Sequence, residues 1–192
     1  MLDTLITSKT RIKLLVRFFL NSNSTSYLRN LESEFNESTN AIRLELNRFE
    51  KAGLLVSGME GNRKIFQANT HHPLFPDISN IIRKYVGFDQ IIDNITTKLG
   101  SLERAYIAGE LALGKDTKNI DLILIGRNID TEFLNKLITK TESLINRKIR
   151  YTIMSDLQEL ESLKKVKEIF IIWQSNNNST VPSNEQIITN SI

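Results

Sequence analysis

The chain has 192 residues, of which 40% are hydrophobic and 24% are charged, and it has no cysteine. This length accommodates one large domain or two small ones, and the lack of cysteine excludes disulfides, thiolate metal sites and cysteine nucleophiles. The net charge of +3 is uneven, because residues 1–87 hold 12 basic against 8 acidic side chains while residues 88–192 hold 13 against 14.

The charge and hydropathy patterns also bear on where the protein works. The basic excess of the first half is compatible with a polyanionic partner. No apolar stretch approaches the ~20 residues that cross a bilayer. The N-terminal sequence MLDTLITSKTRIK lacks the basic-then-apolar order of a signal peptide. We therefore expect a cytoplasmic protein without a membrane partner.

The first part of the chain begins with three stretches of helical periodicity. Arg17 falls off the apolar face of the first stretch. Ser26 and Ser38 are the expected N-caps of the second and third stretches, and Gly53 is the expected left-handed stop of the third. The predicted helices span residues 9–20, 27–35 and 39–52.

A hairpin is predicted to follow these helices. Residues 54–59 and 63–68 are rich in β-prone side chains, and the Glu-Gly-Asn stretch between them is typical of a tight turn. Helix, short helix, helix and hairpin is the order of a winged helix-turn-helix. The sequence TSYLRNLESEFNESTNAIRLELNRFEKAGLLVSGMEGNRKIFQAN resembles the winged-helix domains of ArsR-type bacterial regulators. This resemblance covers residues 8–72 and implies binding of double-stranded DNA.

The third helix is the expected recognition helix, because the major groove of duplex DNA is wide enough for one helix. Asn40 and Arg43 are best placed to contact base edges. Ser38 and Thr39 suit contact with a phosphate, and the wing tip suits contact with the DNA backbone or the minor groove. Each of these residues taken alone is more typical of an ordinary solvated surface, and the order of the elements together with the placement of the residues favours DNA binding. The candidate DNA-binding residues are Ser38, Thr39, Asn40, Arg43, Asn47, Lys51, Asn62, Arg63 and Lys64.

Two observations limit what the resemblance implies. Glu45 and Glu50 lie on the same helix and are expected to dilute its positive field. ArsR-type regulators usually sense metals through clusters of cysteine and histidine, but this chain has only His71 and His72, which are neighbours before a proline. We therefore expect no metal site here.

Residues 73–100 form the predicted join between two domains. A Pro-Leu-Phe-Pro stretch opens the join. Residues 77–86 and 88–99 have the pattern of amphipathic helices, the first with Ile81 facing inward and with Gly87 at its end. Such helices serve either as a dimer contact or as a dock for the second domain. A homodimer would place two recognition helices on the two halves of a palindromic DNA site.

Residues 101–174 alternate between strand-like and helix-like stretches, which predicts a small α/β domain. Phe133 and Leu144 share the apolar face of its longest helix. Residues 169–173 fit either a strand or the buried end of a helix. Residues 175–192 are rich in Asn and Ser and are expected to form a flexible tail. The other predicted strands are residues 102–108, 120–125 and 148–154, and the predicted helices are residues 129–145 and 155–163.

The stretch AYIAGELALGKDTKNIDLILIG resembles the signature of minimal nucleotidyltransferases, in which a strand ends in Gly-Ser or Gly-Gly and a turn leads to Asp-x-Asp on the next strand. Gly109 and Asp121 fit this signature. Glu110 stands where a small residue would receive the triphosphate, and Asn119 replaces the first Asp. Nucleotidyl transfer needs paired carboxylates to hold Mg²⁺. We therefore expect an inactive domain with no catalytic residue, metal or cofactor.

The expected fold class is α+β, with an N-terminal winged helix-turn-helix and a small C-terminal nucleotidyltransferase-like domain. The vestigial site could sense a nucleotide or a nucleotide sugar, or the domain could be an inert scaffold or a dimerisation unit. The alternative function is an active metal-dependent nucleotidyltransferase that holds its substrate with the winged helix. The predicted domains are residues 1–72, 73–100, 101–174 and 175–192. The side chains that could offer charge to a phosphate are Lys115, Lys118, Arg147, Lys148 and Arg150.

Overall fold

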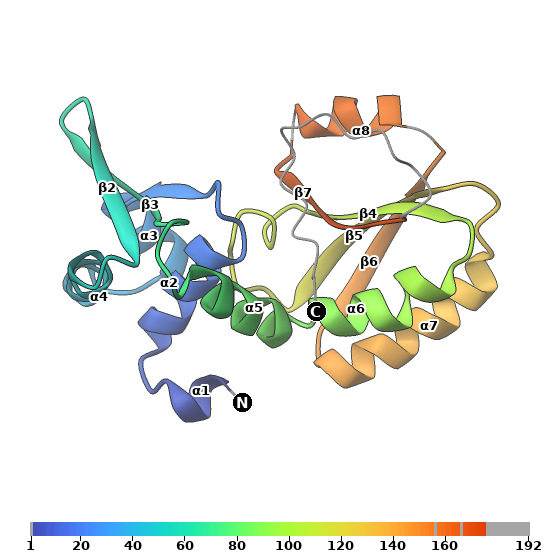
Figure 1. Cartoon of the computed structure of the whole chain (residues 1–192), viewed down its shortest axis with the longest axis horizontal. Helices are drawn as coiled ribbons and strands as arrows, with labels where there is room; N and C mark the ends of the chain where they lie inside the picture. Colours follow the sequence, from blue (N-terminus) through green and yellow to red (C-terminus); the bar gives the residue numbers. More distant parts are fainter. Residues whose placement is uncertain (1, 156, 166, 176–192) are drawn as a thin grey trace. The chain divides into compact units, whose positions relative to one another are not determined.

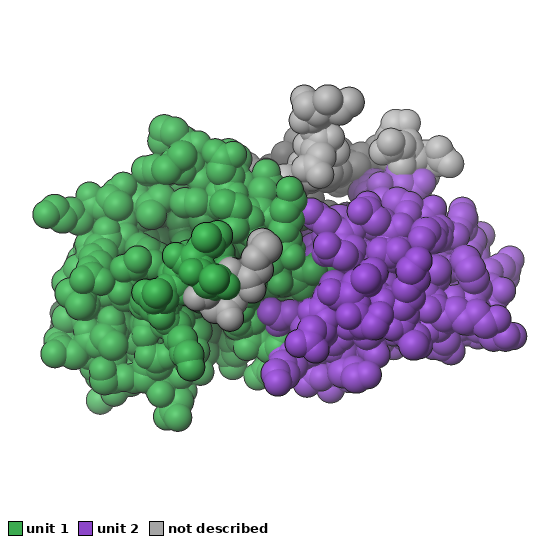
Figure 2. All heavy atoms as spheres, turned by 90° about the horizontal axis from the view of Figure 1, so that it is seen from below, with its two compact units in different colours: residues 1–87, 110–117 green, residues 88–109, 118–192 purple. Residues whose placement is uncertain are grey.

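A computed structural model describes residues 2–155, 157–165 and 167–175 (Figure 1). Two compact units make up the chain: unit 1 consists of residues 1–87 and 110–117, and unit 2 consists of residues 88–109 and 118–192 (Figure 2). The predicted tail lies outside the described residues except for Ser175. Among the residues that the structure describes, no helix is long and apolar enough to cross a membrane.

Unit 1 contains helices and a three-stranded antiparallel sheet with strand order β1-β3-β2. The order of these elements is that of a winged helix-turn-helix, with the β2–β3 hairpin extending beyond the helices as the wing (Figure 1). The elements are α1 (Leu2–Leu5), α2 (Lys9–Phe19), β1 (Thr25–Tyr27), α3 (Leu28–Phe35), α4 (Thr39–Lys51), β2 (Leu55–Glu60), β3 (Arg63–Ala68) and α5 (Phe75–Val86).

Local sequence signals set most of the helix ends in unit 1. Ser38 is the N-cap of α4, as predicted, and its hydroxyl accepts a hydrogen bond from the backbone N–H of Ala41. Gly53 follows the helix with φ +73°, a left-handed conformation that glycine adopts without strain. The prediction that Ser26 caps α3 is wrong. Ser26 lies in the short strand β1, opposite Phe66 of β3, and Tyr27 occupies the cap position.

The core of unit 1 forms where the inner faces of α2, α3 and α4 meet the sheet. Each fully buried Leu, Ile or Phe contributes about 1.5–3 kcal/mol to folding. The helix α5 packs on α2, with the rings of Phe19 and Phe75 5.6 Å apart. Ile81 of α5 was predicted to face inward but is 50% exposed, so that prediction is wrong. Fully buried side chains in this core include Leu14, Phe18, Phe19, Leu31, Ile42 and Leu46.

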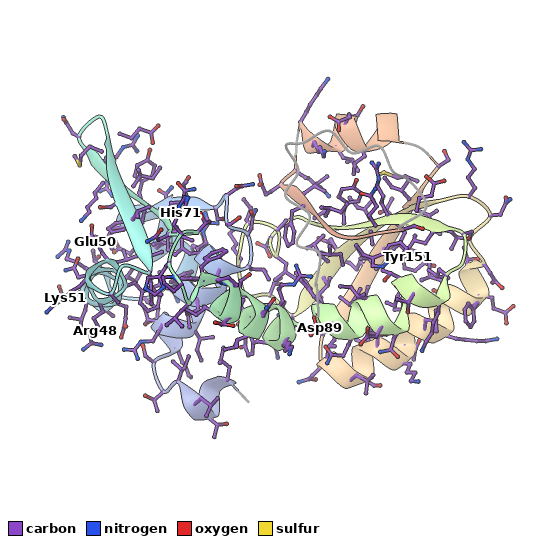
Figure 3. The ribbon with its side chains drawn as sticks, viewed as in Figure 1. Arg48, Glu50, Lys51, His71, Asp89 and Tyr151 are labelled. Atoms are coloured by element: carbon purple, nitrogen blue, oxygen red, sulfur yellow. The ribbon has the colours of Figure 1, made fainter. Side chains whose placement is uncertain are left out.

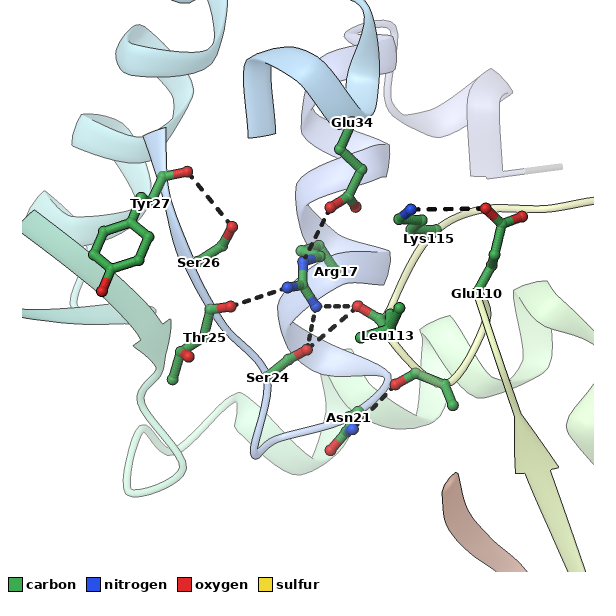
Figure 4. Close-up of polar contacts among 11 residues, drawn as sticks. Arg17, Asn21, Ser24, Thr25, Ser26, Tyr27, Glu34, Glu110, Leu113 and Lys115 are labelled. Carbon is green, nitrogen blue, oxygen red and sulfur yellow. Dashed lines mark hydrogen bonds and ion pairs between the residues drawn. The ribbon is translucent and has the colours of Figure 1, made fainter. Parts of the chain in front are cut away.

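Arg17 departs most from the sequence-based expectation, because it is buried rather than solvated. Its guanidinium donates to the carbonyl oxygens of Leu113 and Thr25 and to the hydroxyl of Ser24 (Figure 4). Leu113 belongs to residues 110–117, the connection between two strands of unit 2, which here forms part of unit 1. The amide of Asn21 also donates to the carbonyl of residue 112, at 3.1 Å. A charged side chain therefore holds this segment by its backbone.

Unit 2 is built on a four-stranded mixed sheet with strand order β6-β5-β4-β7. Strands β5 and β6 run parallel, and the other two pairs are antiparallel. Residues 169–173, left open between strand and helix, lie in a strand. The elements are α6 (Phe88–Asn94), the 3₁₀ helix η1 (Thr96–Lys98), β4 (Leu102–Ala108), β5 (Asn119–Gly126), α7 (Thr131–Ile145), β6 (Lys148–Met154), α8 (Leu157–Lys164) and β7 (Ile169–Gln174).

Helices cover both faces of this sheet, with α6 and α7 on one face and α8 on the other (Figure 1). Burial on both faces explains why residues 122–125 of β5 form a continuous apolar run. On the α8 side, Tyr106 and Ile123 pack with Leu160. Two predictions for α7 are wrong, because Phe133 and Leu144 are 40% and 58% exposed. The predicted helix over residues 88–99 is also shorter, ending at Asn94 before η1.

The unit boundary falls between Gly87 and Phe88. Gly87 has φ +95° and ends α5, as the sequence predicts. Of the segment predicted as a join, α5 therefore belongs to unit 1, and α6 and η1 belong to unit 2.

Candidate nucleic-acid interface

The candidate reading surface is the side of α4 that faces away from the core of unit 1. Its inner side carries Ile42, Leu46 and Phe49, all buried. Eight of the nine predicted DNA-binding residues are exposed, and Thr39 is half-buried. Within the described part of the chain, no ion pair involves Arg43 or Lys51. The structure therefore brings the predicted α4 residues together on one accessible surface.

Both acidic side chains of α4 are bonded to basic side chains. Glu45 is only 5% exposed, and its carboxylate accepts hydrogen bonds from Arg11 and Arg48 at 2.9 Å each. Burial by itself would raise the pKa of Glu45, but the hydrogen bonds and charges of Arg11 and Arg48 outweigh it and lower the pKa. Glu50 is paired with Lys64 at 2.8 Å. The hydrogen bond from Lys64, followed by that from Ser57, lowers the pKa of Glu50.

The wing presents its basic residues on a fixed hairpin. Glu60 pairs with Arg63, which leaves a two-residue turn whose Gly61 has φ +59°. The guanidinium of Arg63 lies over the ring of Tyr27, 4.6 Å from its centroid. Tyr27 also donates to Glu60. Asn62 is exposed at the tip, where the sequence placed it.

Two residues of the exposed surface, Arg48 and Leu44, were not among the predicted candidates. Arg48 projects outward from α4, as does the predicted residue Lys51 (Figure 3). Leu44 is 53% exposed on the same side. Helical spacing predicts that Leu44 and Arg48 lie on this side, because Leu44 follows Asn40 by four positions and Arg48 follows Leu44 by four.

The ion pairs beneath α4 give a pH-dependent prediction. Replacing Glu45 with Gln is expected to cost about 1–2 kcal/mol of stability at pH 7, because charged hydrogen bonds to Arg11 and Arg48 are lost. The pKa of Glu45 is lowered from its ordinary value of 4.5. The stabilisation is therefore present above pH 4.5 and disappears as the pH falls through the lower folded-state pKa. Urea unfolding at pH 7 and pH 3 measures this difference.

The control for this prediction is Glu132→Gln, which removes an exposed i,i+4 pair with Lys136. A surface pair of this kind contributes about 0.5 kcal/mol or less. An equal loss for Glu45→Gln at pH 3 and pH 7 would contradict the account of the pair beneath α4.

In unit 2, Gly109 and Asp121 of the nucleotidyltransferase-like signature lie close together. A Cβ added to Gly109 would lie 2.9 Å from Oδ2 of Asp121, and the φ of Gly109 is +71°. The other carboxylate oxygen, Oδ1, accepts a hydrogen bond from Nε of Arg150 at 2.7 Å. Arg150 is the residue opposite Asp121 in the parallel β5–β6 pair. A cation thus occupies the side of Asp121 that faces β6.

Within unit 2, the other signature residue, Asn119, adds no carboxylate beside Asp121. Asn119 is exposed at the start of β5, opposite Lys148 in the register. Glu110 belongs to unit 1, where its carboxylate lies 3.6 Å from the ammonium group of Lys115. Among the described residues, no group of three or more His, Cys, Asp or Glu side chains is arranged to hold a metal ion.

At least three of the five cations predicted to attract a phosphate have carboxylate partners among the described residues. Lys115 pairs with Glu110, and Arg150 pairs with Asp121. Lys148 pairs with Glu142 at 2.9 Å. A phosphate would have to compete with these carboxylates for the same cations.

The pair His71–His72 shapes the start of α5. Nδ1 of His72 accepts a hydrogen bond from the backbone N–H of Leu74 at 3.1 Å, and the carbonyl oxygen of His72 accepts one from Phe75 at 2.8 Å. His71 is exposed. The local role of His72 is therefore to satisfy backbone groups where the chain enters the helix.

Comparisons with known proteins assign the chain to no family. No protein-family profile matches it, and no curated protein shows significant similarity to it. Among solved structures, the crystal structure of AF1382 from Archaeoglobus fulgidus matches 44% of this chain and 96% of its own, with 20% sequence identity and a TM-score of 0.36. A similarity this distant contributes no argument about function.

Proposed function

We propose that the protein is a transcriptional regulator that reads double-stranded DNA with α4 and the β2–β3 wing. The main observation in support is the charge distribution on α4. Arg43 and Lys51 face solvent without a carboxylate partner among the described residues, while Glu45 is buried beneath them. Neutralising DNA phosphates supplies much of the affinity of such proteins, so an accessible basic surface is the first requirement.

The dimensions of α4 also suit this role. Its 13 residues span about 20 Å at 1.5 Å per residue, and its outer side carries amide and guanidinium groups. Asn pairs with adenine and Arg with guanine through two hydrogen bonds in the major groove. The wing side chain Arg63 then suits the DNA backbone, whereas a phosphate would have to compete with Glu50 for Lys64. The resemblance of residues 8–72 to ArsR-type winged-helix domains also supports the proposal of DNA binding.

Selection of bound sequences from a random duplex pool tests the proposal. We expect enrichment of a short motif, and a palindromic motif with half-sites about one DNA turn apart if the protein binds as a homodimer. Recovery of the unselected pool after several rounds would count against sequence-specific DNA reading.

We propose further that unit 2 is a nucleotidyltransferase-like domain without catalytic activity. Two Mg²⁺ ions held by paired carboxylates stabilise the charge that develops during phosphoryl transfer. Asp121 is the sole acidic residue of this signature on β5, and Arg150 is bonded to it. The ammonium and guanidinium groups nearby do not replace a metal, because they cannot bind several oxygens in octahedral geometry.

Incubation with labelled nucleoside triphosphates and Mg²⁺ is expected to give no label transfer above a blank without protein. The reason is that Asn119 stands where the signature has its first Asp. The informative variants are Asp121→Ala and, as a matched control, Asp93→Ala on an exposed position of α6. Label transfer that vanishes in Asp121→Ala and persists in Asp93→Ala would establish the alternative, an active enzyme.

A further inference from the structure

The centre of the exposed side of α4 is a line of four residues with helical spacing: Asn40, Leu44, Asn47 and Lys51. All four are exposed, and Leu44 retains 53% of its accessible surface. Three of them are polar or charged, so Leu44 is the apolar member at the centre of an otherwise polar row.

Basic residues flank this row on both sides. Arg43 lies on the side of α4 that carries Glu50, seven positions later, and Glu50 is bonded to Ser57 and Lys64 of the hairpin. Arg48 lies on the opposite side, where it is bonded to Glu45. Cations at both margins suit the two phosphate backbones that border a major groove. Leu44 then lies, with Asn47, in the row between these two margins, where base edges would be reached.

We propose that Leu44 is a specificity-determining residue that contacts the 5-methyl group of a thymine in the major groove. This inference rests on the proposed function, since it requires that α4 enter the groove. Thymine is the one standard base that presents a methyl group there, and apolar side chains recognise it by burying it. Leu44 has no hydrogen-bonding atom, so burial of a methyl group is the readout its side chain can supply.

The neighbouring residues are consistent with an A·T base pair at this position. Asn40 and Asn47 lie within one turn of Leu44 on the same row. An Asn amide pairs with N6 and N7 of adenine, and the thymine methyl group lies on the partner base of the same pair or on an adjacent pair. The inferred substrate class is therefore duplex DNA with an A·T pair under the middle of α4, rather than RNA, which lacks the methyl group.

The test replaces single thymines with deoxyuridine in the selected duplex, which removes the methyl group and keeps the base pairing. At one position, the native protein is expected to lose about fourfold in affinity, as for one buried methyl group. Leu44→Ala is expected to bind the thymine duplex more weakly and to show no further loss with deoxyuridine at that position. Leu44→Met is expected to restore part of the sensitivity.

Leu144→Ala is the matched control, because Leu144 is a comparably exposed leucine, at 58%, on α7 of unit 2, outside the proposed DNA-binding surface. This variant is expected to keep the full sensitivity to deoxyuridine. Equal affinity of the native protein for every deoxyuridine duplex, or unchanged sensitivity in Leu44→Ala, would overturn the role of Leu44 while leaving DNA binding intact. Failure to bind any duplex would instead overturn the proposed function itself.

Discussion

Replacing Gly114 with alanine is expected to lower the free energy of unfolding of unit 1 by about 3 kcal/mol. Gly114 is buried, with φ +80°, and a Cβ there would lie 2.5 Å from the carbonyl oxygen of Arg17 and 2.7 Å from its Cα. These are backbone atoms of α2, so a rotamer change cannot relieve the clash. The left-handed conformation adds its own cost for any residue with a Cβ.

Gly61→Ala provides a matched control for Gly114→Ala. Gly61 also has a positive φ, +59°, but no atom lies within 4 Å of the added Cβ. This control therefore measures the backbone strain alone, which is about 1 kcal/mol. Hydrogen exchange of the amides in α2 and α4 reports unit 1 separately from unit 2. Equal effects of the two substitutions would contradict the close packing of residues 110–117 on α2.

Reversing two charges on α4, in the double variant Arg43→Glu and Lys51→Glu, is expected to weaken duplex binding by at least about 100-fold at 0.1 M salt. Both side chains are exposed, and neither has a carboxylate partner among the described residues. The new carboxylates would face DNA phosphates. The slope of log affinity against log salt should also decrease, by about one for each phosphate contact that is lost. Fluorescence anisotropy over a salt series measures both quantities.

The control for this variant is the same change of charge on α7, Lys136→Glu and Lys140→Glu, which alters the net charge equally on exposed positions of unit 2. This control is expected to change the affinity by less than about threefold, because Lys136 and Lys140 are not among the proposed DNA contacts and salt at 0.1 M screens charges that touch no phosphate. An equal loss in both double variants would mean that the overall charge of the protein, rather than α4, determines binding.

Local signals made much of the fold predictable from the sequence. The cap at Ser38, the left-handed glycine Gly53 and the hairpin turn depend on residues a few positions apart, and all three occur as predicted. The strand β1 was missed because its three residues, Thr25–Tyr27, are ordered by pairing with β3, some 40 positions later. Strand pairing over such a distance leaves little trace in local periodicity.

The same distinction explains what could be predicted of the candidate site. The exposed residues of α4 follow from helical periodicity, so the sequence identified most of them. The burial of Arg17 could not be found this way, because its partner Leu113 is 96 residues away in the chain. The ion pair between Asp121 and Arg150 depends on the register of two parallel strands. Such nonlocal contacts require the three-dimensional structure.

The most direct test of the DNA-reading surface is a titration of the isotopically labelled full chain with a selected duplex, followed by amide chemical-shift changes. We predict that the largest changes occur in residues 38–51 of α4 with its cap and in residues 60–64 of the wing, and that they weaken with added salt. The account would be contradicted if the duplex bound and the largest changes fell in unit 2, or if residues 38–51 were unaffected at saturation.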